Sequence, residues 1–294
     1  MNLRAKKVIM MLRISIKLNR YSLFSLLLAL AIPQIGSAAQ TISHQKRKAA
    51  GVWAEVVTID MNNSDVKLAP AITRRGIGHS ERFQTFLDRT RPTAAITGTF
   101  FDTRSLCPVG DIVVEGTMVN RGVVGTAIGI GWNNEVTFIP TKRGVICDWS
   151  SYRHVLAAGP QLLVDRKITV APWNEGFSDG GIYASRPRAA IGQTKQNKIM
   201  FVAIKRPLQL TQLARVMRSL GCVNAAVLDG GSSTALYYRG KIITHPARKL
   251  TNVLLAYDNS IKYDQAVAHL APNLRDRLAE RRQEATDTIE LVFP

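Results

Sequence analysis

The segment Leu228–Thr234, LDGGSST, has the residue types and spacing of a binding or catalytic turn. It follows the apolar run AAVL, so Asp229 ends a strand that we expect to be buried, where an unpaired carboxylate costs free energy. The paired glycines let the backbone turn tightly, and the hydroxyl residues after them supply donors. The alternative interpretation is that Asp229 caps the turn through backbone amides, as aspartate commonly does. The binding candidates of this turn are Gly230, Gly231, Ser232 and Ser233.

Three further segments share this design of an apolar strand, a glycine-containing turn and a polar side chain. They are Thr97–Asp102 (TGTFFD), Pro108–Asp111 (PVGD) and Arg186–Gly192 (RPRAAIG). Asp102 and Asp111 are site candidates, with turn capping as the alternative. Arg188 is a candidate whose alternative is a surface position on a hairpin. The other substrate-binding candidates are Thr97, Gly98, Thr99, Phe100 and Gly110.

Strands dominate the pattern around these segments. The stretch 188–205, RAAIGQTKQNKIMFVAIK, has two apolar runs around a polar turn and predicts a hairpin. Apolar residues at helical spacing predict helices over 82–90 and 211–220. The second helix can act as a crossover between the hairpin and the strand before Asp229, so we expect Arg188 and Asp229 to face one cleft.

The order of the elements predicts one α+β domain over residues 51–258. We expect it to be built on a mixed, strand-rich sheet with a few packed helices. Residues 259–294 are rich in charge and weakly amphipathic, which predicts a helical tail. Residues 40–50 are polar and basic and are interpreted as a linker.

Residues 1–39 have the pattern of a secretory signal peptide. Cations up to Arg20 precede an 11-residue apolar run, Ser22–Ile32, and an alanine-containing exit. That run is shorter than the roughly 20 residues that span a bilayer. A retained membrane anchor is the alternative. We expect cleavage near Ala38 or Ala39, an exported periplasmic or extracellular protein, and no stable membrane insertion afterwards.

The composition is that of an ordinary globular protein. The 294 residues are 46% hydrophobic and 20% charged, which excludes a disordered chain, a collagen-like chain and a multi-pass membrane protein. The formal net charge is +18, and the first 39 residues account for six of the cations. Nucleic acid is not an expected partner, because the chain looks exported and has no recognisable binding motif.

Three cysteines are too few for a disulfide-based fold. Cys222 is expected in the core, and the pairing of Cys107 with Cys147 stays open at this stage. The five histidines are scattered and no cysteine pair has CxxC spacing, so no structural zinc site is predicted. We expect no cofactor, although a divalent cation at the site stays open.

An ordered series of motifs from Val52 to Tyr257 resembles the phosphodiester glycosidase family. The series is ITGTFFD, CPVGDIVVEG, AAGPQLLVD, RPRAAIG, LARVMRSLGC, NAAVLDGGSSTAL and ARKLTNVLLAY. The most specific part is the PRxAIG hairpin followed, after a helix, by LDGG. Three positions depart from the family pattern. Thr97 stands where the family usually has asparagine, and Thr99 and Ser232 stand where it usually has glycine.

The resemblance implies a hydrolase that cleaves the glycosidic bond of a phosphodiester-linked sugar, with bacterial members associated with exopolysaccharide genes. Such cleavage needs a carboxylate near the anomeric carbon and cationic or amide donors for the departing phosphate. The resemblance therefore implies Asp229 as base or nucleophile, Asp102 as its partner or orienter, and Arg188 as the phosphodiester clamp. The amides of residues 230–233 would assist.

A different class of function is a non-catalytic envelope protein that binds anionic polysaccharide. The chain keeps a net charge of about +12 without its first 39 residues, which would suit an acidic polymer. The two hypotheses differ in whether removal of the site carboxylates abolishes turnover.

Overall fold

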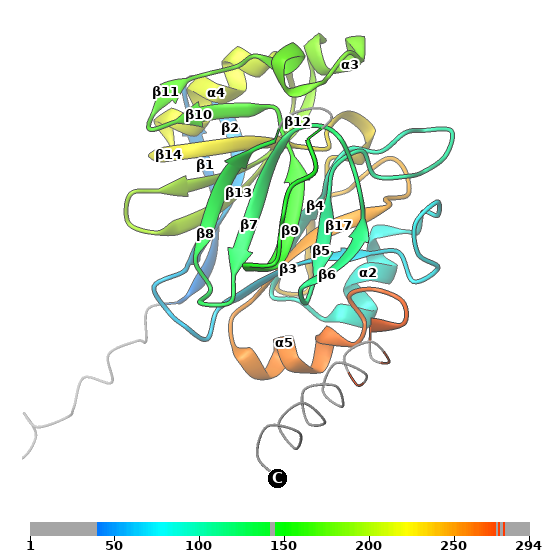
Figure 1. The fold of residues 1–294 in the computed structure, drawn as a ribbon. Coiled ribbons are helices and arrows are strands. Elements are labelled where there is room, and N and C mark those ends of the chain that lie inside the picture. Colours follow the sequence, from blue (N-terminus) through cyan, green and yellow to red (C-terminus); the bar gives the residue numbers. More distant parts are fainter. Residues whose placement is uncertain (1–39, 142–144, 275, 277–278, 280–294) are drawn as a thin grey trace, which may run out of the picture. The chain divides into compact units, whose positions relative to one another are not determined.

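The computed structural model describes residues 40–141, 145–274, 276 and 279, and this part of the chain contains three β-sheets and four α-helices. The predicted α+β class is confirmed (Figure 1). The predicted signal peptide and most of the predicted tail beyond residue 274 lie outside the described residues. No helix among the described residues is long and apolar enough to cross a membrane.

The largest sheet has seven strands in the order β1-β2-β13-β12-β14-β10-β11. They are β1 (Ile42–Ala49), β2 (Val52–Asp60), β10 (Gln161–Val164), β11 (Lys167–Ile168), β12 (Arg186–Thr194), β13 (Lys198–Leu208) and β14 (Cys222–Leu228).

Two five-stranded sheets complete the strand set. The first has the order β16-β15-β4-β17-β3 and the second the order β6-β5-β9-β7-β8. The first consists of β3 (Lys67–Ile72), β4 (Ala94–Thr97), β15 (Leu236–Tyr238), β16 (Lys241–Thr244) and β17 (Asn252–Tyr257). The second consists of β5 (Ile112–Val114), β6 (Thr117–Asn120), β7 (Thr126–Gly131), β8 (Val136–Pro140) and β9 (Tyr152–Ala158).

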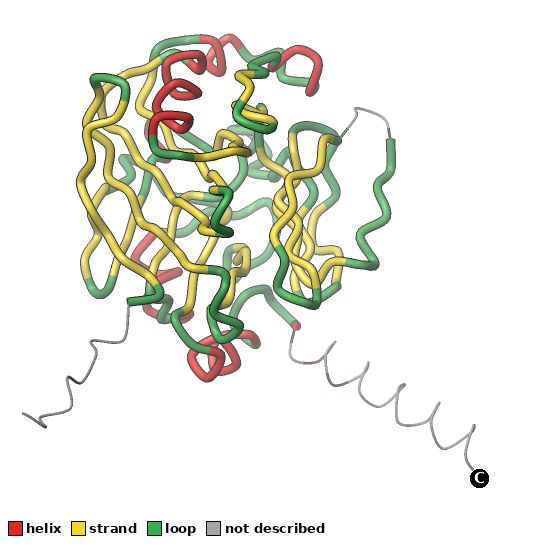
Figure 2. Tube along the Cα trace, turned by 90° about the vertical axis from the view of Figure 1, so that its left-hand side faces the viewer, coloured by secondary structure: helices red, strands yellow, loops and turns green. Residues whose placement is uncertain are grey.

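The helices are short and lie outside the sheets (Figure 2). They are α2 (Phe83–Thr90), α3 (Gly180–Tyr183), α4 (Leu210–Ser219) and α5 (Ser260–Val267), with 3-10 turns η1 (Pro172–Glu175) and η2 (Gly231–Ser233). The helices predicted over 82–90 and 211–220 correspond to α2 and α4. Helix α2 ends at Arg91, which adopts the left-handed conformation just before Pro92.

The strand pairing differs from the mixed sheet that we expected, because the pairs between the described strands are all antiparallel. Helix α4 does link two parallel strands, β13 and β14. However, β12 lies between them and pairs with both, so the two parallel strands never touch. The crossover and the expected neighbourhood of the strands that carry Arg188 and Asp229 are confirmed, since β12 and β14 pair directly.

The interpretation of residues 40–50 as a linker is wrong. Residues 42–49 form β1, which pairs with β2 through eight positions. The turn between them, Ala50-Gly51, has positive φ at both residues, as a tight hairpin requires. The segment reads as polar because β1 is an edge strand whose side chains at Gln45, Lys46 and Lys48 face solvent, while only its ends are buried.

Helix α4 packs its apolar face on β10 and β14. Leu213, Val216 and Met217 are buried there, and the approach is close because β12 offers Gly192. A Cβ at Gly192 would lie 2.5 Å from the Cys222 sulfur and 2.7 Å from Cε of Met217, so no larger residue fits without a shift. This packing holds β12 and β14 in register below the site.

The three cysteines are free in the structure, which leaves Cys107 and Cys147 unpaired with each other. Cys222 is buried as expected.

Candidate active site

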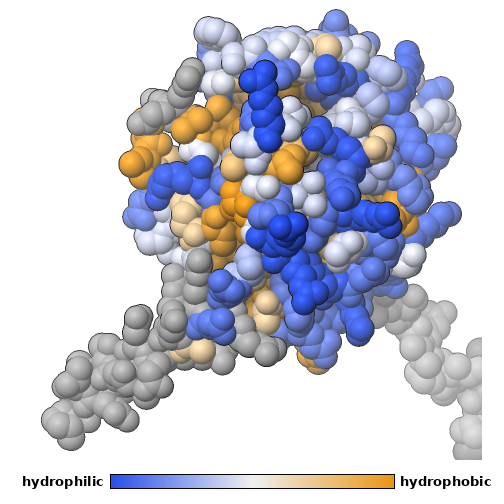
Figure 3. All heavy atoms as spheres, turned by 90° about the vertical axis from the view of Figure 1, so that its right-hand side faces the viewer, coloured by the Kyte–Doolittle hydropathy of each residue, from blue (hydrophilic) through white to orange (hydrophobic). Residues whose placement is uncertain are grey.

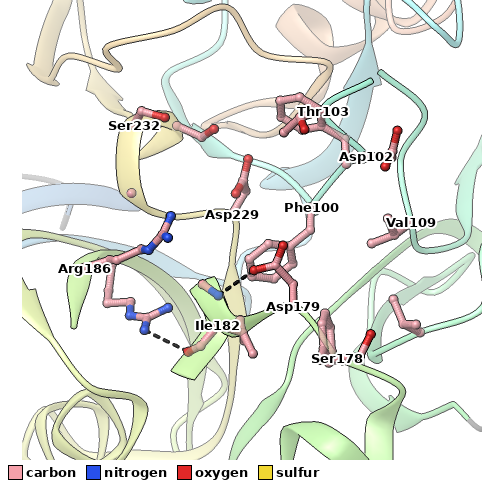
Figure 4. Close-up of a pocket in the computed structure, with 18 of the residues that line it drawn as sticks. Phe100, Asp102, Thr103, Val109, Ser178, Asp179, Ile182, Arg186, Asp229 and Ser232 are labelled. Atoms are coloured by element: carbon pink, nitrogen blue, oxygen red, sulfur yellow. Dashed lines mark hydrogen bonds between the residues drawn. The ribbon is translucent and has the colours of Figure 1, made fainter. Parts of the chain in front are cut away.

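A cavity of about 430 Å³ opens where β12 begins and β14 ends. These two strands pair directly, with Ala189 opposite Leu228, so the residues just before and just after them are brought together. The other walls come from the segment after β4, the segment that contains α3 and the residues before β17. Figure 4 shows the side chains that face this cavity.

The turn after β14 is held by backbone contacts from three directions. The Asp229 amide donates to the Gly98 carbonyl at 2.9 Å, and the Ala247 amide donates to the Ser232 carbonyl at 2.7 Å. A Cβ at Gly230 would lie 2.8 Å from the Pro187 carbonyl oxygen, so the turn also fits closely against β12. Asp229 and the residues of this turn, Gly230, Gly231, Ser232 and Ser233, all line the cavity, as the sequence predicts.

Asp229 is the half-buried carboxylate of the site and points into the cavity (Figure 4). Burial raises the pKa of Asp229 to about 6, although the Ser233 hydroxyl, the charge of Arg248 and the Gly230 amide act in the opposite direction. The carboxyl group therefore exchanges a proton near neutral pH. A group poised in this way suits proton transfer or nucleophilic attack.

Arg188 lines the same cavity as Asp229, but its guanidinium is committed to the protein. Its Nε donates to the Leu208 carbonyl at 3.0 Å, and its Nη2 donates to the carbonyls of Ile182 at 2.9 Å and Ala184 at 2.5 Å. Burial, helped by the charge of Arg186, lowers the pKa of Arg188 to about 10. These contacts describe a positioning residue that ties α3 to the sheet, which differs from the phosphate clamp suggested by the resemblance.

Asp102 also lines the cavity, and it has the turn-capping contacts of the alternative interpretation. Its Oδ1 accepts hydrogen bonds from the amides of Arg104 and Ser105 and from the Ser105 hydroxyl. These bonds, led by the Ser105 amide, lower the pKa of Asp102. Its contacts therefore stabilise the loop after β4, and no hydrogen bond between Asp102 and Asp229 is found in the described structure.

Five predicted binding residues lie outside the cavity lining. They are Thr97, Gly98, Thr99, Gly110 and Asp111. The Asn252 side chain accepts from the Thr99 amide at 2.7 Å and would lie 1.9 Å from a Cβ at Gly98, so this segment is packed against β17.

Gly110 and Asp111 belong to a second packed region. A Cβ at Gly110 would lie 2.0 Å from the Ala157 carbonyl oxygen. Asp111 is buried and accepts from the Trp149 ring nitrogen at 2.7 Å and the Gly122 amide at 2.6 Å. Together with Thr97–Thr99, these residues support the loops behind the cavity, and their glycines mark close backbone approach.

The remaining predicted residue, Phe100, lines the cavity and packs against Phe177 with ring centroids 5.5 Å apart. Phe177 belongs to the segment before α3, which Glu175 anchors. The Glu175 carboxylate accepts from the Thr126 hydroxyl and the Gln161 amide, both at 2.8 Å. Burial raises the pKa of Glu175, against the effect of these bonds.

Three charged side chains of the lining were missed by sequence reasoning: Asp179, Arg186 and Arg248. The motif RPRAAIG contains Arg186, but the resemblance directed attention to the second arginine. Arg248 lies in the stretch ARKL, whose position beside the Asp229 turn depends on the contact between Ala247 and Ser232. Asp179 caps α3 by accepting from the Gly181 amide.

Metal binding has no candidate site in the described part of the chain, where no group of three or more His, Cys, Asp or Glu side chains is placed to hold an ion.

A sequence model of the phosphodiester glycosidase family matches residues 90–257, more than half of the chain. No protein in a search of curated proteins matches significantly.

Among solved structures, a hypothetical protein from Synechocystis superimposes with a TM-score of 0.65 at 17% identity, covering 74% of this chain and 62% of that one. The catalytic domain of zebrafish N-acetylglucosamine-1-phosphodiester alpha-N-acetylglucosaminidase, described as auto-inhibited by its pro-peptide, gives a TM-score of 0.59 at 19% identity, covering 74% and 81%. A protein from Burkholderia pseudomallei gives 0.53 at 15% identity, covering 70% and 74%. These likenesses confirm the fold.

Proposed function

Because the chain belongs to the phosphodiester glycosidase family, we propose that it hydrolyses the bond between the anomeric carbon of a sugar and a phosphodiester oxygen at the Asp229 cavity. The observation that carries this proposal is the position of Asp229. It is a half-buried carboxylate with a pKa raised to about 6, at the end of a fixed strand and facing a cavity of about 430 Å³. That volume falls in the range of small-molecule sites, roughly 300–1,000 Å³.

The chemistry asked of the protein is limited. Phosphate is a good leaving group, so the anomeric centre needs more assistance than the leaving oxygen. An ionised Asp229 can stabilise the positive charge that develops at the anomeric carbon, either as a nucleophile or as the base that activates water. Phe100 and Phe177, which both line the cavity, offer an apolar surface for the sugar.

The substrate and location are also proposals. The zebrafish protein acts, by its name, on N-acetylglucosamine-1-phosphodiesters, so an N-acetylglucosaminyl phosphodiester is the first substrate to test. Export of the chain and a role in envelope or exopolysaccharide metabolism rest on the signal-like residues 1–39 and on the resemblance.

The test is turnover by the purified protein. Glycosyl phosphodiesters, beginning with UDP-N-acetylglucosamine, would be incubated with wild type and with Asp229→Asn, and release of free sugar and UDP would be followed by chromatography. Release by wild type that is lost in the variant, with both proteins folded by circular dichroism, supports the proposal. Binding of acidic polysaccharide with no turnover of any glycosyl phosphodiester would contradict it and favour a non-catalytic envelope protein.

A further inference from the structure

The cavity contains three arginines whose guanidiniums differ in how they are used. Arg188 donates from Nε and Nη2 to three backbone carbonyls. Arg186 and Arg248, in contrast, form no side-chain hydrogen bond or ion pair with any described residue. Both line the cavity, where Arg186 is exposed and Arg248 half-buried. Two cations in one cavity whose guanidiniums form no hydrogen bond or ion pair with the described residues can receive an anion.

Each of the two guanidiniums is placed by a separate element. Arg186 begins β12 and runs beside the Asp229 turn, since a Cβ at Gly231 would lie 3.8 Å from Cδ of Arg186 (Figure 4). Arg248 precedes β17, and its guanidinium carbon lies 4.3 Å from the ring centroid of Phe101, which fixes its direction. The neighbouring Ala247 is bonded to Ser232, so this arginine also stands beside the turn.

We propose that Arg186 and Arg248 form a guanidinium pair that binds the phosphoryl group of the substrate beside Asp229, and that this pair binds the departing phosphomonoester more tightly than the phosphodiester. The proposal rests on the proposed function for the identity of the reaction. The anion contact is thus assigned to Arg186 and Arg248 and not to Arg188, the arginine of the PRxAIG motif. Arg188 keeps the role of positioning the part of the cavity wall that contains Arg186.

The preference for the product follows from the charge balance of hydrolysis. The bond between the anomeric carbon and the phosphate oxygen breaks, and its electron pair stays on that oxygen. Water supplies the oxygen of the new sugar hydroxyl, and its proton goes to Asp229 and then to solvent. The phosphoryl group thereby gains negative charge, so two neighbouring cations stabilise the transition state more than the ground state.

Of the three carboxylates in the cavity, Asp229 interacts electrostatically with Arg248, and the other two do not neutralise this pair. Asp102 is bonded to the amides and hydroxyl of its own turn, and Asp179 accepts from the Gly181 amide at the start of α3. Neither forms an ion pair with an arginine in the described part of the chain.

The experiment measures ligand affinity in the Asp229→Asn background, which prevents turnover. Calorimetry at low salt would compare UDP, UDP-N-acetylglucosamine, inorganic phosphate and free N-acetylglucosamine. We expect UDP to bind more tightly than UDP-N-acetylglucosamine. Arg186→Gln or Arg248→Gln should weaken UDP binding at least tenfold and should reduce the difference in affinity between UDP and UDP-N-acetylglucosamine. The matched control is Arg206→Gln, an exposed arginine on β13 outside the cavity, which should change affinity less than twofold.

The outcomes separate this inference from the proposed function. UDP and phosphate affinities that survive both substitutions, or the absence of any phosphate binding, overturn the guanidinium pair even if the wild type hydrolyses glycosyl phosphodiesters. Conversely, arginine-dependent phosphate binding by a protein that shows no turnover upholds the pair and rejects the hydrolase.

Discussion

Asp229 and Glu115 are two carboxylates that are shielded from water, but their surroundings shift their pKa values in opposite directions. Glu115 is buried at the turn between β5 and β6, where Arg153 donates to its two oxygens at 2.7 and 3.2 Å. The Tyr263 hydroxyl, from α5, donates to Oε1, and the His154 ring lies 3.3 Å from it. Burial alone would raise the pKa of Glu115, but the bonds from His154, Arg153 and Tyr263 outweigh it and lower the pKa to about 2.

Asp229 has no such set of partners, and burial prevails in its case. A carboxylate surrounded by donors is fixed in one charge state and serves to join elements, here α5 to the sheet of β5 and β9. A carboxylate left short of donors in a cavity keeps access to both charge states. Burial alone therefore does not mark a reactive carboxylate, whereas burial that its partners only partly offset does.

The largest expected effect is on turnover. Asp229→Asn preserves the shape of the side chain but removes its charge and should lower kcat about 10²–10⁴-fold, the usual cost of losing one positioned acid or base. Glu115→Gln should leave kcat per folded molecule within about twofold, because Arg153, His154 and Tyr263, to which Glu115 is bonded, lie outside the cavity lining. Steady-state kinetics on glycosyl phosphodiesters checks both, and equal losses in the two variants would contradict the distinction.

The second expected effect is on stability, and here Glu115→Gln should be more damaging than Asp229→Asn. Glu115→Gln leaves the buried charge of Arg153 and the ring of His154 without their acceptor, and should lower the free energy of unfolding by roughly 3 kcal/mol, the lower end for breaking a buried pair. Arg153 is a quarter exposed, which keeps the cost at that end. Chemical denaturation at pH 7 measures it, and a loss below about 1 kcal/mol would mean that the cluster is not a stabilising joint.

The two arginines of the RPR motif extend the comparison to cations. Arg188→Gln leaves three backbone carbonyls without their donor, so we expect a loss of about 2 kcal/mol in the free energy of unfolding. Arg186→Gln removes an exposed, unpaired side chain and should change stability by less than about 0.5 kcal/mol. Thermal melting of the two variants side by side tests this, and equal shifts would show that Arg188 is no more a positioning residue than Arg186.

The smallest expected effect is a difference in pH dependence. The folded-state pKa of Asp229 is raised, so its favourable contribution exists below about pH 4 and is lost as pH rises through about 6. The folded-state pKa of Glu115 is lowered. Its stabilising contribution is therefore present when the pH is above the ordinary pKa of glutamate, and it is lost as the pH falls toward about 2.

At pH 7, Asp229→Asn should therefore have a free energy of unfolding about 1–2 kcal/mol higher than that of wild type. This difference should disappear near pH 4. Glu115→Gln should differ from wild type most at pH 7 and least near pH 3. Denaturation curves at pH 3, 4, 5.5 and 7 check both slopes, and parallel curves for the two variants would refute the opposite signs.

Local sequence patterns located this site. They failed for residues whose role depends on contacts with distant parts of the chain. The apolar run before Asp229, the two glycines and the hairpin at Arg188 are local signals, and all lie at the cavity. Gly98 and Gly110 carry the same signal, yet they serve close packing against Asn252 and Ala157. A glycine-containing turn looks alike in sequence whether a ligand or another strand approaches it.

The roles of the arginines were beyond sequence reasoning for a related reason. Whether a guanidinium is free depends on which carbonyls surround it, and those around Arg188 come from 182, 184 and 208. Strand β1 shows the same limit at the level of the fold. Its polar residues match a linker in composition, and only pairing with β2 makes them a strand.

The position of β17 has a consequence for the way the chain is made. This strand lies between β3 and β4, and among the described strands it is the only partner of β3. A ribosome adds about 5–20 residues per second, so the edges of β3 and β4 facing β17 wait roughly ten to thirty seconds for the strand that covers them. Exposed strand edges of that kind invite pairing with other chains. Asn252 belongs to the same strand and bonds the Gly98–Thr99 backbone, which in turn contacts Asp229. The nascent chain therefore completes this sheet and the support of its cavity in one late step.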